Sequence, residues 1–380
     1  MNKEIKKDTI FVSIASYRDS VCNNTVKSML EAADNKNRVF VGICQQNKDE
    51  DEDCLLSFEE SPNLKIIRIK HTEAKGPTYA RYLCSTLWDG EEYYFQIDSH
   101  TKFVKSWDTK LINMIKKIKQ MGLSKKPVIS HYPKEITDYE SRDKGQYSVP
   151  RMCKSFFNKR DMISFLGAET MDTKKEFYQT PYVAGGMVFS ESYFLNELPY
   201  DPELPYLFVG EEILHSIRYY TNGWDIFTPD ENIIFHEYTR RDKPKIWTDN
   251  PTYSDMDAFE KVKYYIGLVS DDSKIKDNLK KNLHKYGLGS ERSLQDYYNF
   301  AGIDINNKIV KKNFCRKDNE ASDEDIFKSN ENNHGKEYKK EVKENFTIFN
   351  KNNKNNNNVI LYSILIIAFL AILIIIIKFL

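Results

Sequence analysis

Short apolar runs alternate with helix-like patterns over roughly the first 130 residues of the chain. Runs rich in β-branched and aromatic residues are typical of strands, and apolar positions three and four residues apart are typical of helices. The pattern predicts strands at Ile10–Ala15, Arg38–Cys44, Leu64–Ile69 and Tyr93–Asp98, and helices at Ser20–Ala33, Gly76–Trp88 and Ser106–Met121. This alternation predicts an α/β fold with a mostly parallel, mixed sheet flanked by helices. Ligands bind at the carboxyl ends of strands in such sheets, which directs attention to the loops after Ala15, Cys44 and Asp98.

The end of the chain is its most apolar segment. Val359–Ile377 holds 19 residues without a charge, and Ser363 is its one polar side chain. About 20 apolar residues span a bilayer as a helix, whereas a soluble helix usually keeps a polar stripe. Because only three residues follow, we expect a single transmembrane helix that acts as a tail anchor, with the rest of the chain facing the cytosol. Lys351 and Lys354 before the span agree with that orientation, and the run Ile10–Ala15 is too short for a signal peptide.

The composition changes before this segment. Residues 323–358 are rich in Asn, Lys, Glu and Asp, and Asn345–Asn358 holds eight asparagines in fourteen residues. Such a segment buries too little apolar surface to offset its chain entropy. We therefore expect a folded domain over residues 1–302, a polar flexible stalk over 303–358 and the membrane anchor over 359–377.

Charge and composition exclude two classes of protein. The 56 basic residues balance the 56 acidic ones, and a neutral chain lacks the basic field that non-specific nucleic-acid binding requires. An aromatic content of 13% excludes a mainly disordered chain. The six cysteines form no Cys-x-x-Cys pair and are too sparse for the disulfide framework of a small domain. We expect reduced, mostly buried thiols, and we expect the acidic run 49–53 to be a solvated loop.

The most informative motif ends the predicted strand at Asp98. Residues two apart in an extended backbone point to the same side, so Asp98 and His100 can present a carboxylate and an imidazole to one cation. Mixed oxygen and nitrogen ligation suits manganese, and a hard divalent ion can bridge to pyrophosphate oxygens. An Asp-x-His motif alone is weak, and two polar residues at the end of a strand are the alternative.

A second segment combines carboxylates with a histidine. Glu211 and Glu212 follow Gly210 at the start of a predicted helix, where acidic residues are also ordinary partners of the helix dipole. A predicted strand follows the helix and continues to Glu237. His236 comes after three apolar residues in it, so a buried core histidine is the alternative to a ligand.

Seven segments together carry a resemblance to a known family. They lie in order over roughly residues 8–245, and the set is specific in a way that no single motif is. The segments are Phe11–Asp19, Gly76-Pro77-x-x-Ala80-Arg81, Asp98-Ser99-His100, Pro181-Tyr182-x-Ala184-Gly185-Gly186, Phe208–Glu212, Arg218-x4-Gly223-Trp224-x-Ile226 and His236-Glu237-Tyr238. The chain resembles the cytosolic polypeptide α-N-acetylglucosaminyltransferases that modify hydroxyproline on a ubiquitin-ligase adaptor protein. These enzymes are similar in turn to the mucin-type polypeptide N-acetylgalactosaminyltransferases.

The resemblance implies a fold, a donor and a metal. The fold is the Rossmann-like GT-A fold, the donor is UDP-N-acetylglucosamine (UDP-GlcNAc), and the anomeric configuration is retained. A divalent cation, Mn²⁺ or alternatively Mg²⁺, would have Asp98, His100 and His236 as ligands. Arg81 and Asp98 would help to hold the nucleotide, although a surface ion pair is the alternative for Arg81.

The resemblance also assigns the residues around the donor. Ser13, Ser16, Arg18 and Asp19 would line the nucleotide site, while a helix cap at Asp19 or Ser20 is the alternative. The backbone of Gly185 and Gly186 would approach the donor sugar, and a simple turn is the alternative there. Glu211 or Glu212 would lie near the reacting sugar and the acceptor hydroxyl.

These assignments lead to one functional hypothesis and several alternatives. The hypothesis is a membrane-anchored, metal-dependent transferase that moves N-acetylglucosamine from UDP-GlcNAc to a protein hydroxyl of Ser, Thr or hydroxyproline. The acceptor attacks from the face of the leaving group, and the departing phosphate takes the proton. The alternatives are a transferase with another UDP-sugar donor, a degenerate nucleotide-sugar or glycan-binding membrane protein, and a membrane tether that makes only protein contacts.

Overall fold

The computed structural model describes residues 4–239, 242–250 and 252–316. The chain divides into two compact units, Met1–Lys328 and Ser329–Leu380, and all described residues belong to the first. Among them, no helix has both the length and the apolar character needed to cross a membrane. The predicted anchor at 359–377 lies outside the described residues.

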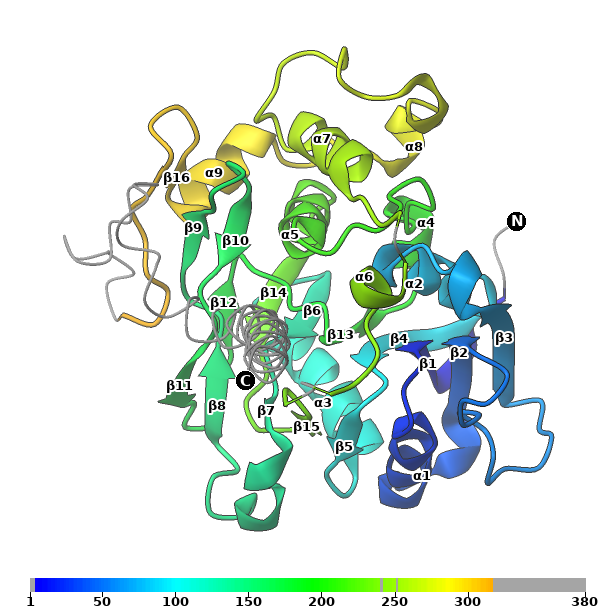
Figure 1. Ribbon diagram of the computed structural model, residues 1–380. Helices are drawn as coiled ribbons and strands as arrows, with labels where there is room; N and C mark the ends of the chain where they lie inside the picture. The colour runs from blue at the N-terminus through cyan, green and yellow to red at the C-terminus, as the bar shows by residue number, and fades with distance from the viewer. Residues whose placement is uncertain (1–3, 240–241, 251, 317–380) are drawn as a thin grey trace, which may run out of the picture. The chain divides into compact units, whose positions relative to one another are not determined.

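A large mixed sheet forms the centre of the described residues (Figure 1). Its strand order is β12 (Tyr178–Thr180), β14 (Asp225–Thr228), β6 (Pro127–Ser130), β13 (Met187–Glu191), β4 (Glu91–Asp98), β1 (Lys6–Tyr17), β2 (Val39–Asn47) and β3 (Leu64–Lys70). The four strands from β3 to β4 are parallel, as are β6 and β14. β13 is antiparallel to both its neighbours, and β12 is antiparallel to β14. The predicted α/β fold with a mostly parallel, mixed sheet is confirmed.

Helices cover both faces of this sheet, which explains why its central strands are apolar almost throughout. α1 (Cys22–Ala32) and α3 (Trp107–Gln120) pack on one face, where Ile10, Val12 and Ile14 of β1 lie. Phe11 points to the opposite face, into a cluster that contains Tyr219. α2 (Pro77–Thr86) and α5 (Glu211–Thr221) belong to that second side. The three helices predicted in the first 130 residues are therefore confirmed.

A second core lies around α5. Its buried residues come from α5, α7 (Met256–Tyr265), α9 (Leu294–Ala301), β9 (Ser155–Phe157) and β10 (Ile163–Phe165). The hairpin of β16 (Ile303–Asp304) and β17 (Ile309–Val310) packs on it, and Phe314 is buried there too. Residues 303–316, placed by the sequence at the start of the polar stalk, thus pack against the domain, while the rest of the predicted stalk lies outside the described residues. The remaining elements are β8 (Ser148–Arg151), β11 (Glu169–Asp172), α4 (Phe194–Glu197), α6 (Ile246–Asp249) and α8 (Leu283–Tyr286).

One predicted strand is in fact two. The sequence pattern suggested a strand that runs past residue 228 as far as Glu237, but β14 ends at Thr228 and a separate strand, β15 (Ile234–His236), begins after a turn that contains Pro229. β15 leaves the large sheet and joins β5 (Thr101–Phe103) and β7 (Lys134–Glu135) in a small sheet. Proline lacks the N–H that a central strand needs, so the chain turns there.

The prediction of six reduced cysteines is wrong. Cys22 is disulfide-bonded to Cys54, and Cys153 to Cys315. Cys44 and Cys84 are free and buried. The spacing of 162 residues between Cys153 and Cys315 shows why no local motif could reveal the pair.

Candidate donor and metal site

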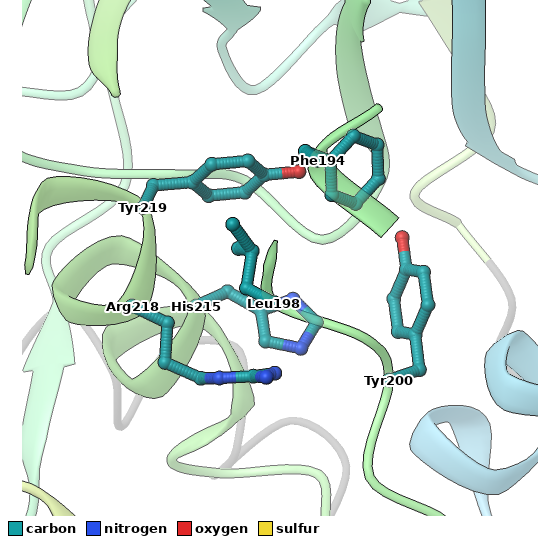
Figure 2. Close-up of a pocket in the computed structure, with 6 residues that line it drawn as sticks. All are labelled: Phe194, Leu198, Tyr200, His215, Arg218 and Tyr219. Carbon is teal, nitrogen blue, oxygen red and sulfur yellow. The ribbon is translucent and has the colours of Figure 1, made fainter. Parts of the chain in front are cut away.

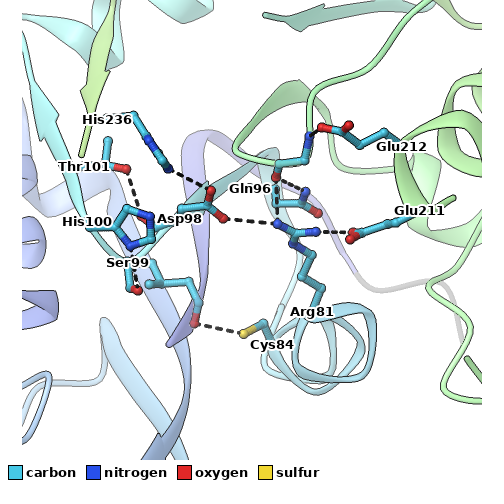
Figure 3. A network of polar contacts seen from close by, with 12 residues as sticks. Arg81, Cys84, Gln96, Asp98, Ser99, His100, Thr101, Glu211, Glu212 and His236 are labelled. Atoms are coloured by element: carbon cyan, nitrogen blue, oxygen red, sulfur yellow. Dashed lines mark hydrogen bonds and ion pairs between the residues drawn. The ribbon is translucent and has the colours of Figure 1, made fainter. Parts of the chain in front are cut away.

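Three predicted ligands from two separate parts of the chain lie together at the carboxyl end of β4 (Figure 3). Asp98 is the last residue of β4, His100 precedes β5, and His236 is the last residue of β15. Because β15 pairs antiparallel with β5, His236 lies opposite Thr101 and next to His100. One candidate ligand atom from each of Asp98, His100 and His236 lies within 4.8 Å of the other two. The structure therefore brings the three residues to one point.

The chemistry of these three side chains fits a divalent cation. Nε2 of His236 is 3.1 Å from Oδ2 of Asp98, and the two imidazole rings have centroids 4.5 Å apart. Burial favours a neutral carboxyl, but the hydrogen bond with His236 and the charge of Arg81 outweigh it and hold the pKa of Asp98 well below its ordinary value. An ionised carboxylate beside two imidazoles is a donor set that Mn²⁺ accepts.

Arg81 of α2 lies beside this cluster and is buried. Its guanidinium forms an ion pair with Glu211, and Nη2 donates to Oδ1 of Asp98 at 3.2 Å and to the carbonyl of Gly185 at 2.9 Å. Burial opposes the charge of Arg81, but the carboxylates of Glu211 and Asp98 overcome that effect and raise its pKa. Arg81 is thus a buried, charged bridge rather than half of a surface ion pair.

Gly185 and Gly186 lie against the same groups. A Cβ atom on Gly186 would come within 2.8 Å of Oδ2 of Asp98, and one on Gly185 within 3.3 Å of Nη1 of Arg81. The carbonyl of Gly185 also accepts a hydrogen bond from Nε2 of Gln96. The absence of side chains lets this backbone approach the charged cluster closely.

The two adjacent glutamates differ in their surroundings. Glu211 is buried and bound to Arg81. Glu212 is partly exposed, and its two oxygens accept hydrogen bonds from the N–H of Gly185 at 2.7 Å and from the hydroxyl of Tyr132 at 2.6 Å. The loss of solvation around Glu212 raises the pKa of its carboxyl to about 7. Nothing in the sequence pattern pointed to Tyr132, which follows β6.

The residues predicted around the nucleotide occupy three kinds of position. The side chains of Ser13 and Ser16 are fully buried. Arg18 is held between two carboxylates, with Nε 2.7 Å from Asp51 and Nη1 2.8 Å from Asp249 of α6. The acidic run was expected to be a solvated loop, and this is wrong for Asp51, which holds Arg18.

Asp19 contacts a candidate ligand directly. Its Oδ2 is 2.9 Å from Nδ1 of His100 and accepts a hydrogen bond from the hydroxyl of Ser99 at 2.6 Å. Its side chain does not cap α1, because the N-cap position is Val21 and no side chain caps this helix. The predicted alternative of a helix cap at Asp19 is therefore wrong.

Comparison with known proteins places the chain in a family. The sequence model of the family described as "Glycosyltransferase (GlcNAc)" matches residues 9–61 and 57–307, which is most of the chain. The chain belongs to this glycosyltransferase family. No curated protein matches the sequence of this glycosyltransferase significantly.

Solved structures add information on the fold. The crystal structure of GalNAc-T7 with UDP, GalNAc and Mn²⁺ aligns with a TM-score of 0.50 at 17% identity. The alignment covers 77% of this chain and 58% of GalNAc-T7. The likeness supports a GT-A type of fold for the glycosyltransferase, whose chain spans little more than half the length of that relative.

Structures of S. aureus TarS align less well. TarS 1–349 in complex with UDP-GlcNAc has a TM-score of 0.42 at 13% identity, with 77% of this chain and 73% of that chain covered. A TM-score of 0.42 is too low to support any inference about this chain from TarS.

A small aromatic hollow of the glycosyltransferase is drawn in Figure 2, and none of its lining residues is a candidate site residue. It is lined by Phe194, Leu198, Tyr200, His215, Arg218 and Tyr219, and it has no room for a water molecule. Tyr200 connects this hollow to the site, because its hydroxyl donates to Gln96, which in turn holds Gly185. The hollow offers no space for a ligand. Its wall contributes to the site through the hydrogen bonds from Tyr200 to Gln96 and from Gln96 to Gly185.

Proposed function

We propose that this glycosyltransferase moves N-acetylglucosamine from UDP-GlcNAc to a protein hydroxyl, in a reaction that needs a divalent metal and retains the anomeric configuration. The observation that carries the proposal is the meeting of Asp98, His100 and His236 beside Arg81 and Glu212. The family description supports N-acetylglucosamine as the sugar. The resemblance to hydroxyproline-modifying enzymes supports Ser, Thr or hydroxyproline as the acceptor.

Each group has a stated part in the proposed reaction. Asp98, His100 and His236 would hold Mn²⁺ or Mg²⁺, which when bound would neutralise negative charge on the UDP leaving group. Arg81 acts by fixing Asp98 and the carbonyl of Gly185, because its guanidinium is already engaged with both. Glu212 has a partly exposed carboxylate, which accepts a hydrogen bond from a hydroxyl of the sugar or of the acceptor.

The bond changes need no protein nucleophile. The acceptor oxygen bonds to the anomeric carbon from the face that UDP leaves, while the bond from that carbon to the diphosphate oxygen breaks. The hydroxyl proton passes to the departing phosphate. The chain's residues then serve to bind, orient and stabilise charge, which are the main contributions that fixed dipoles and charges make to such reactions.

The experiment is a UDP-release assay on the full chain, purified in a mild detergent. UDP-GlcNAc, UDP-GalNAc and UDP-glucose are compared with and without Mn²⁺, using peptides that contain hydroxyproline, Ser or Thr. We expect Mn²⁺-dependent turnover that is highest with UDP-GlcNAc and is lost in Asp98→Asn and His236→Asn.

Glu191→Gln is the matched control, because Glu191 lies at the opposite end of β13 from Gly186 and pairs with Lys119. Its turnover should equal that of the wild type. Preference for another donor would reassign the sugar. Tight binding of UDP and Mn²⁺ without turnover would instead favour the alternative of a degenerate binding protein.

We also propose that the apolar segment 359–377 anchors the protein to a membrane with the transferase domain in the cytosol. Alkaline carbonate extraction of membranes from cells that express the full chain tests the anchor, and protease protection tests the side. Retention in the pellet together with digestion by external protease is expected. Release into the supernatant would contradict the anchor.

A further inference from the structure

Asp19 makes contacts that neither a nucleotide contact nor a helix cap explains. The residue is 2% exposed, although it lies in the loop between β1 and α1. One oxygen, Oδ2, faces Nδ1 of His100 at 2.9 Å and accepts the hydroxyl of Ser99 at 2.6 Å. The other, Oδ1, accepts the backbone N–H of Val21 at 3.2 Å. Among the described residues, these three groups hold the carboxylate in one orientation.

The contact determines which nitrogen of His100 can bind a metal. A carboxylate oxygen can only accept a hydrogen bond, so Nδ1 of His100 carries the proton in the contact with Asp19. The lone pair of the neutral ring is then on Nε2. A carboxylate that accepts the second ring N–H of a histidine ligand both orients the ring and makes the free nitrogen more basic.

We propose that Asp19 is the positioning residue for His100: it holds the imidazole with Nε2 directed to the divalent cation that Asp98 and His236 share. The inference rests on the proposed function, because it assumes that the three residues bind a metal. It assigns to the β1–α1 loop a role in metal affinity, whereas the resemblance had assigned this loop to the nucleotide.

His236 provides an internal contrast. Nε2 of His236 faces Asp98, and its Nδ1 is buried without a hydrogen-bond partner among the described residues. Of the two candidate histidine ligands, His100 is thus the one whose Nδ1 faces a carboxylate, which leaves its Nε2 for the metal. We expect the affinity of the site to depend strongly on this one carboxylate.

The test measures Mn²⁺ binding without nucleotide, by electron paramagnetic resonance of free Mn²⁺ in titrations of the full chain. Asp98→Asn protein gives the level of Mn²⁺ bound elsewhere on the surface. Asp19→Asn keeps the shape and the acceptor for Val21 but removes the charge. We expect it to weaken binding by about 10- to 100-fold, the usual effect of losing such a partner.

A double variant separates positioning from a general loss of structure. If Asp19 acts through His100, Asp19→Asn causes no further loss of affinity in a His100→Ala background. Asp108→Asn is the matched control, because Asp108 is a completely buried carboxylate that binds the N–H groups of Asp34 and Asn35 and the side chain of Arg38. It should lower the melting temperature and leave Mn²⁺ affinity unchanged.

Each outcome decides one of two claims. Wild-type affinity in Asp19→Asn would contradict the role of Asp19 and leave the proposed function standing. A wild-type chain that transfers the sugar without binding Mn²⁺ would remove the metal assignment and this inference together. If Asp19→Asn does not fold, Ser99→Ala replaces it, since it removes one hydrogen bond to the same carboxylate, and a loss of a few-fold is expected.

Discussion

Glu211 and Glu212 are neighbours in sequence, yet their carboxylates have different surroundings and different partners. Glu211 is buried in an ion pair with Arg81, so its carboxylate is engaged. Glu212 is partly exposed and holds hydrogen bonds from Tyr132 and Gly185. The sequence could not separate the two, because the distinction depends on the place of Arg81, which is 130 residues away along the chain. The structure favours Glu212 as the carboxylate that meets a substrate hydroxyl.

The raised pKa of Glu212 leads to a prediction about pH. With a pKa of about 7 in the folded state against 4.5 when unperturbed, the folded protein binds more protons than the unfolded chain between these values. Stability therefore falls as pH rises from about 4.5 to about 7. We expect Glu212→Gln to raise the melting temperature at pH 8 and to lower kcat by about 10- to 100-fold, the cost of one lost hydrogen bond to a charged group. It should also abolish the rise of kcat/KM through pH 7 that ionisation of Glu212 predicts for the wild type. A wild-type pH–rate profile in Glu212→Gln would contradict this role.

Glu211→Gln should act in the opposite direction on stability. It leaves the buried guanidinium of Arg81 without its main partner, and breaking a buried ion pair costs about 3 kcal/mol. A lower melting temperature in Glu211→Gln, measured by calorimetry beside Glu212→Gln, is the expected result. Equal changes of melting temperature in Glu211→Gln and Glu212→Gln would contradict the different roles that we assign to the two glutamates.

At the scale of elements, strand pairing places the site. β4 ends at Asp98, and the pairing of β5 with β15 sets His236 opposite Thr101. The loop before β13 then brings Gly186 against Asp98. The relative positions of the three candidate ligands therefore depend on the strand register of two sheets rather than on the conformation of one loop.

A side chain on Gly186 should disturb this arrangement. Its backbone is not left-handed, so alanine is conformationally allowed, but the added Cβ would lie 2.8 Å from Oδ2 of Asp98. We expect Gly186→Ala to weaken Mn²⁺ binding at least 10-fold. Gly185→Ala, where the nearest atom is the flexible end of Arg81 at 3.3 Å, should weaken it less, and the same titration compares the two.

Local patterns predicted the elements well and the long-range contacts poorly. The strands and helices of the first 130 residues were predictable because their apolar periods and flanking turn residues are local. The partners of Arg18 were not, since Asp51 and Asp249 come from a loop and a short helix far apart in sequence. The break between β14 and β15 was missed because apolar residues lie on both sides of it, although Pro229 marks the turn.

At the scale of the whole molecule, the cysteines bear on where the protein works. The disulfide between Cys22 and Cys54 joins α1 to the loop that carries Asp51. The disulfide between Cys153 and Cys315 joins the loop before β9 to the segment after β17. Disulfides are rare in a reducing cytosol. The redox state of the four paired cysteines is therefore a direct test of the cytosolic location that we propose for the domain.

Thiol labelling tests the pairing. In denatured, unreduced full chain, an alkylating agent should label only Cys44 and Cys84, and after reduction it should label all six cysteines. Peptide mass spectrometry reads the labelled positions. Six labelled thiols before reduction, in protein taken directly from cells, would contradict the disulfides and support the cytosolic placement.

The central claim is that Asp98, His100 and His236 serve the transfer of N-acetylglucosamine to a protein hydroxyl. The most direct measurement is mass spectrometry of acceptor peptides after incubation with the full chain, UDP-GlcNAc and Mn²⁺. Peptides that carry one N-acetylhexosamine on hydroxyproline, Ser or Thr, formed only with Mn²⁺ and absent with Asp98→Asn, are the predicted result. Unmodified peptides with every UDP-sugar, or equal modification by Asp98→Asn, would contradict the claim.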